Sequence, residues 1–126
     1  MWINEAFGWV WVLAGFLSGL ALGLGFHRDD WLGGYGSFPR RLIRLGHISF
    51  LGLGILNIVF SLSGPHLALG VGALRLASWS LIVGGITMPT CCALMAWRRG
   101  FRVFFGIPVA ALVLGATLTV VGILGR

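Results

Sequence analysis

The sequence predicts an all-α integral membrane protein, an up-down bundle of four transmembrane helices that forms a single transmembrane domain over residues 1–126. Apolar residues make up 58% of the chain and charged residues only 10%, whereas about 25% of an average soluble domain is charged. The mean hydropathy is +0.99. Four apolar runs are each long enough for the roughly 20 residues that a membrane-spanning helix needs.

The four apolar runs predict the helices in chain order. No basic residue precedes the first run and arginines follow it, so we expect a retained helix and not a cleaved signal peptide. Ser37 can cap the second helix, with Pro39 in its first turn. Away from their ends, the runs contain no formally charged residue. We expect helices at about residues 7–26, 42–63, 74–97 and 103–124.

The arginines predict the orientation in the membrane. Seven of the nine cationic residues lie in or beside the connections at about residues 27–41 and 98–102. Because cytoplasmic connections are enriched in cations, we expect both of these connections in the cytoplasm and both termini on the outer side. The bacterial inner membrane is the expected location.

The same arginines indicate which partners the chain meets. The net charge is +6, but the arginines lie at the ends of apolar runs and not on one face, so we expect no binding to nucleic acid. Arg40, Arg41 and Arg44 begin the second helix. We expect them to contact anionic lipid head groups or the acidic surface of a partner.

Small and polar residues within the runs predict helix packing. Gly15, Gly19 and Gly23 are spaced four residues apart in the first run. Small residues at this spacing let helix backbones approach closely in lipid. They predict packing inside the bundle or a docking face for another subunit. Asn57 lies within the second run, where we expect it to form a hydrogen bond between helices.

His47 is the histidine that lies within a predicted span. An imidazole in hydrocarbon is costly unless it has a partner, so His47 is a candidate site residue. In one hypothesis it satisfies the Gly85 carbonyl, which Pro89 leaves without its helical hydrogen bond, or another polar group across the helix pair. In that hypothesis, His47 has a structural role only.

Two other hypotheses give His47 a cofactor. Met88, Cys91 and Cys92 lie at a similar depth on the third helix, and their spacing places them on one helical face. His47 with Met88, or with a residue from another chain, could supply the axial ligands of haem b. His47 with Cys91 and Cys92 could instead hold a soft metal such as copper.

Three function classes follow. The main expectation is a small accessory or structural subunit of a larger membrane protein complex, with other membrane subunits or a second copy as partner. A respiratory or redox-linked complex is one candidate for this larger assembly. The alternatives are a haem b electron-transfer subunit that uses His47, and a small membrane transporter. The chain resembles the small multidrug resistance transporters in size and helix number, but it lacks the acidic residue of their first helix. We expect no catalytic activity of its own, because no span pairs a nucleophile with a base and an orienting acid.

Overall fold

A computed structural model describes residues 2–126 and contains four long helices. Each of the four is long and apolar enough to cross a membrane. The prediction of an all-α fold with four helices able to span a membrane is therefore confirmed. The helices are α1 (Trp2–Phe26), α2 (Phe38–Ser63), α3 (Val71–Trp97) and α4 (Gly106–Leu124), and the connections contain the short 3-10 helices η1 (Trp31–Gly33), η2 (Gly64–His66) and η3 (Arg99–Phe105).

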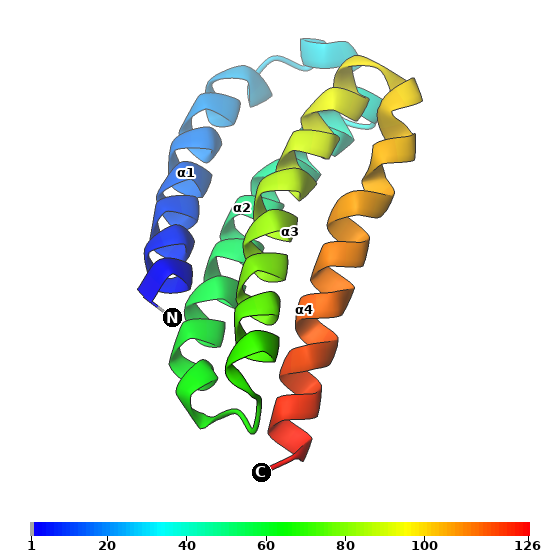
Figure 1. The fold of residues 1–126 in the computed structure, drawn as a ribbon. Helices are drawn as coiled ribbons and strands as arrows, with labels where there is room; N and C mark the ends of the chain where they lie inside the picture. The colour runs from blue at the N-terminus through cyan, green and yellow to red at the C-terminus, as the bar shows by residue number, and fades with distance from the viewer. Residues whose placement is uncertain (1) are drawn as a thin grey trace.

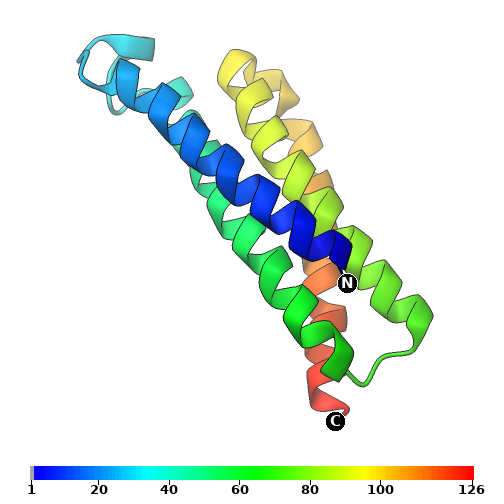
Figure 2. The same ribbon diagram turned by 90° about the vertical axis from the view of Figure 1, so that its left-hand side faces the viewer.

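The helices form an open up-down bundle. Each helix packs on the next one along the chain, while α1 and α4 share no packed interface within residues 2–126. Both termini lie at one end of the bundle, and η1 and η3 lie at the other (Figure 1). We call these the terminal end and the arginine-rich end. Toward the arginine-rich end, α1 and α3 diverge from each other (Figure 2).

Three helices begin earlier than the apolar runs indicate. Helix α1 begins at Trp2 and not near residue 7, since it includes the polar residues before the run. Helix α2 begins at Phe38, because the Ser37 side chain accepts a hydrogen bond from the Arg40 backbone NH and Pro39 lies in the first turn. Helix α3 begins at Val71. Residues 99–105, where the last run was expected to begin, form η3 instead, and α4 begins at Gly106.

An apolar core lies between α2, α3 and α4 in the terminal half of the bundle. Phe60 of α2 packs there with Ala77 and Leu81 of α3. Gly115 of α4 makes room for Leu81, since a Cβ atom at Gly115 would lie 2.8 Å from the Leu81 side chain. A small residue on α4 therefore permits the close packing of α3 and α4.

Helices α1 and α2 approach each other closely at Gly8, which the sequence pattern did not indicate as a packing position. A Cβ atom at Gly8 would lie 2.5 Å from the Gly54 carbonyl oxygen and 2.5 Å from Cγ1 of Ile58. A Cβ atom at Gly54 would in turn lie 2.8 Å from the Gly8 carbonyl oxygen. Backbone therefore meets backbone at this crossing, and only glycine fits at either position.

The three glycines singled out in the first run differ in their surroundings. A Cβ atom at Gly15 would lie 2.6 Å from the Leu51 side chain, and one at Gly19 would lie 2.8 Å from the His47 ring. Gly23 does not pack, because a Cβ atom there would meet nothing within 4 Å. At 3.6 residues per turn, a residue eight positions beyond Gly15 points about 80° away from it. Gly23 therefore lies outside the face of α1 that contacts α2.

Candidate functional site

A buried polar cluster joins α1, α2 and α3 near the terminal end. Asn4 and Asn57 are both fully buried. Asn4 Nδ2 donates to Asn57 Oδ1 at 2.8 Å and to the Ser78 carbonyl oxygen at 3.2 Å, while Ser78 Oγ donates to Asn4 Oδ1. Asn57 Nδ2 donates to the carbonyl oxygens of Leu53 at 2.9 Å and Leu81 at 3.4 Å. Both amide groups are thus bonded within the chain, which makes the cluster a clasp between three helices.

A second polar contact between α1 and α3 lies one helical turn from Pro89. Proline has no backbone NH, so the carbonyl of Gly85 lacks its usual helical donor. Trp11 Nε1 donates to this oxygen at 2.7 Å. The Trp11 ring also stacks on Phe7, with ring centroids 4.4 Å apart. Trp11, and not His47, bonds the Gly85 carbonyl, so only the Gly85 version of the structural hypothesis for His47 is wrong.

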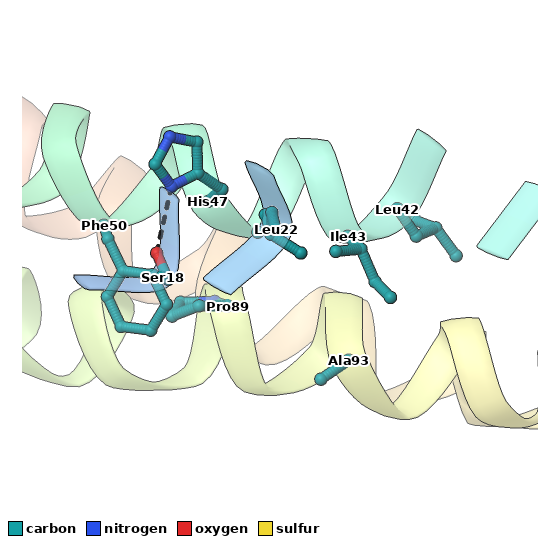
Figure 3. Close-up of a pocket in the computed structure, with 9 residues that line it drawn as sticks. Ser18, Leu22, Leu42, Ile43, His47, Phe50, Pro89 and Ala93 are labelled. Carbon is teal, nitrogen blue, oxygen red and sulfur yellow. Dashed lines mark hydrogen bonds between the residues drawn. The ribbon is translucent and has the colours of Figure 1, made fainter. Parts of the chain in front are cut away.

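His47 has its partner on α1. Its Nδ1 atom lies 2.9 Å from Ser18 Oγ, and Ser18 Oγ also lies 2.9 Å from the Gly15 carbonyl oxygen. A hydroxyl has one proton. Ser18 Oγ therefore either donates to the Gly15 carbonyl and accepts from the Nδ1–H of His47, or donates to Nδ1, so the contact is compatible with both tautomers of His47. The other ring nitrogen, Nε2, points away from Ser18 (Figure 3).

A small cavity lies beside His47, between the diverging α1 and α3 and over α2. Its volume is about 150 Å³. Most of its walls are apolar, with Leu22, Phe50 and Pro89 among them, and Ser18 and His47 contribute the polar atoms (Figure 3). Pockets for drug-sized ligands usually measure about 300–1,000 Å³. The cavity is therefore too small to enclose a large cofactor within this chain alone.

The structure does not bring the proposed cofactor ligands to His47. Met88, Cys91 and Cys92 do not line the cavity. Cys91 Sγ lies 3.6 Å from the Phe104 carbonyl oxygen, toward η3, and Cys92 is buried next to Gly46. Across residues 2–126, no three His, Cys, Asp or Glu side chains are grouped so that they could hold a metal ion. Cys91 and Cys92 thus lie toward η3 and α2, whereas the His47 ring lies against Gly19 of α1.

Arg40 differs from the expected lipid or partner contact and is only 3% exposed. Its guanidinium donates to the carbonyl oxygens of Phe26 at 3.1 Å and Arg28 at 3.4 Å. It also lies over the Phe26 ring, 4.8 Å from the centroid. The carbonyls at the end of a helix lack helical donors and carry partial negative charge, so a cation is favourable there. Arg40 thus closes the end of α1 and ties it to α2.

The other two arginines of this group lie nearer the surface. Arg44 donates to the Tyr35 carbonyl oxygen at 3.0 Å, and its guanidinium stacks 4.0 Å from the centroid of the Tyr35 ring. Arg41 is exposed. Of the three, Arg41 has the greatest access to lipid head groups or a partner.

No protein-family model, curated protein or solved structure matches the chain. Function is therefore inferred from the contacts described above. Four residues form contacts between helices that were not predicted from the sequence: Asn4, Gly8, Trp11 and Ser18. Asn4 and Trp11 carried a signal, since each is a hydrogen-bonding side chain close to or within an apolar run.

Proposed function

We propose that the chain is a small accessory subunit of a larger membrane protein complex, with no catalytic activity of its own. The proposal rests on one observation: polar side chains within the spans form hydrogen bonds to other helices of the same chain. Asn4, Asn57 and Ser78 bond to one another and to backbone, and Trp11 bonds to the backbone of α3. Transport pathways and active sites in membranes usually need ionisable groups that face a water-filled cavity. Here the polar groups hold helices together instead.

The exposed helix faces support the same proposal. Phe16 and Leu20 of α1 are 65% and 67% exposed, and Val113 of α4 is 60% exposed. The connections between helices are short and contain no further domain. Contacts with other membrane subunits would therefore form through helix faces, with lipid covering the remainder.

We further propose that the arginine-rich end faces the cytoplasm of a bacterial cell and that both termini lie outside. The arginine-rich end holds seven of the nine arginines, and Arg75 and Arg126 lie at the terminal end. Cationic residues in short connections are retained on the cytoplasmic side of the inner membrane. The imbalance in arginine number supports this orientation.

Site-directed photo-cross-linking in native membranes tests the subunit proposal. A photoreactive amino acid is placed at Phe16 or Leu20 on α1, or at Val113 on α4. Because α1 packs on α2 and α4 packs on α3, the two sets of positions lie on different helix faces, and each is a control for the other. We expect discrete adducts with another membrane polypeptide from at least one helix face. Adducts with lipid alone from all three positions would contradict the proposal.

A second candidate function is electron transfer through haem b, and the geometry of His47 favours it. An axial histidine typically donates one ring NH to a protein oxygen and presents its other nitrogen to the metal. His47 fits this arrangement in the tautomer whose Nδ1–H donates to Ser18 Oγ. Since the cavity measures about 150 Å³ and Met88 does not line it, the second ligand and most of the haem surface would come from another chain.

The visible absorption spectrum of the protein, purified in mild detergent with its associated subunits, tests the haem candidate. If it is correct, a Soret band shifts on reduction, disappears in His47→Ala and persists in His66→Ala, a control in the connection at the terminal end. A spectrum without such a band, or a band that survives His47→Ala, excludes this role for His47.

A further inference from the structure

The connection between α3 and α4 combines arginines with aromatic rings. Arg98, Arg99 and Arg102 are all exposed. The rings of Trp97 and Phe101 stack with centroids 6.4 Å apart, and the Phe101 and Phe104 centroids are 6.0 Å apart. A row of rings with cations beside it therefore lies at the arginine-rich end of the spans, at the level where aromatic side chains gather in membrane proteins.

Two guanidinium groups of this connection, those of Arg98 and Arg99, stack on aromatic rings and keep their hydrogen-bond donors available. Arg98 lies over the Trp97 ring, 5.0 Å from its centroid, and Arg99 lies over the Phe38 ring at 4.2 Å. Stacking uses the flat face of a guanidinium, so the N–H donors in its plane remain available for an anion. Arg40, by contrast, directs its donors at backbone carbonyls.

Few acidic groups compete for these donors. Within residues 2–126, the one ion pair joins Arg28 and Asp30, at 4.0 Å, and both side chains are largely exposed. Asp29 and Asp30 are the acidic residues of the arginine-rich end. The α3–α4 connection is therefore left with uncompensated positive charge.

A shallow groove lies within the same connection. Its volume is about 260 Å³, and it is lined by Arg98, Gly100, Phe101 and Phe104. A Cβ atom at Gly100 would meet nothing within 4 Å. The groove thus has aromatic rings along its walls and a cation beside them.

We propose that this groove binds an anionic phospholipid. The lipid phosphate would bond to the guanidinium group of Arg98, which lines the groove, since guanidinium binds phosphate through paired N–H donors. The exposed Arg102 of the same connection would add to the positive charge that attracts the phosphate. The glycerol and the first part of an acyl chain would lie on the rings of Phe101 and Phe104. These rings offer nothing to a free phosphate ion, so the occupant is a lipid. The inference does not depend on the proposed function.

Lipid retention measured by native mass spectrometry tests the charge part of this site. The protein is released from bilayers of phosphatidylcholine with phosphatidylglycerol, and bound phosphatidylglycerol is counted. We expect Arg98→Gln with Arg102→Gln to weaken retention by about 30-fold, since each arginine near a membrane surface contributes about a factor of five. The matched control is Arg75→Gln with Arg126→Gln, which removes the same charge from the terminal end and should retain the lipid. Equal losses in both pairs would overturn the proposal.

Gly100→Leu tests the groove without removing charge. The new side chain has space within the protein, so the helical content by circular dichroism should not change, but it would fill the groove. We expect a loss of bound phosphatidylglycerol, with Gly36→Leu as the control, because Gly36 also meets nothing within 4 Å of an added Cβ atom and lies outside the groove. Unchanged retention in Gly100→Leu, or full displacement of the lipid by inorganic phosphate, would overturn the proposal.

Discussion

Gly8→Ala is expected to destabilise the bundle by about 1–3 kcal/mol, the usual cost of forcing extra volume into a packed interface. The added Cβ atom would lie 2.5 Å from the Gly54 carbonyl oxygen. Backbone cannot rotate away as a flexible side chain can, so α1 and α2 must move apart. The free energy of unfolding, measured by denaturant titration in mixed micelles, gives the cost directly.

Gly23→Ala is the matched control for this prediction. It makes the same substitution on the same helix, but the added Cβ atom meets nothing within 4 Å. Alanine is the better helix former by up to about 1 kcal/mol, so Gly23→Ala should be neutral or slightly stabilising. If Gly8→Ala is as stable as Gly23→Ala, the close crossing at Gly8 is not a feature of the folded protein.

Asn57→Leu is expected to cost about 1–3 kcal/mol of unfolding free energy. The substitution keeps the branched shape of the side chain but removes the hydrogen bonds to Asn4 and to the Leu81 carbonyl, which both lie on other helices. Hydrogen bonds between membrane helices contribute about 0.6 kcal/mol on average and up to about 1.7. The same denaturant titration measures the loss.

Thr90→Val is the control for Asn57→Leu, because it removes a polar group whose hydrogen bond stays within its own helix. The exposed Thr90 hydroxyl bonds only to the Ile86 carbonyl of its own helix, at 2.7 Å. Its removal should change the unfolding free energy by less than about 0.5 kcal/mol, as is usual for surface positions. If Thr90→Val lowers the unfolding free energy as much as Asn57→Leu does, the contacts of Asn57 with other helices contribute nothing beyond the loss of a polar group.

The four helices could be predicted from the sequence because a span needs only length and apolar composition. The start of α2 could also be predicted in part, since Ser37 and Pro39 cap and begin a helix through contacts a few residues away. Such features depend on neighbours along the chain. They do not require knowledge of which helix faces which.

The partners of the candidate site residues depend on helix rotation and register, which the sequence of one chain does not specify. His47 and Asn57 stand out as polar residues in apolar runs, but nothing local pairs them with Ser18 and Asn4. The four-residue spacing of Gly15, Gly19 and Gly23 gave no sign that α1 turns the last of them away from α2. The burial of Arg40 depends on the position of the Phe26 carbonyl, which only the folded connection provides.

The proposed structural role depends most on the buried amides of Asn4 and Asn57, which hold the helices of this chain together. A double-mutant cycle on Asn4→Leu and Asn57→Leu measures the free energy of interaction between the two side chains. We predict that the double variant loses about 0.6–1.7 kcal/mol less than the sum of the two single losses, the range for a hydrogen bond between membrane helices. If the losses of unfolding free energy are additive, Asn4 and Asn57 do not stabilise each other. The main support for a structural role of the chain is then lost.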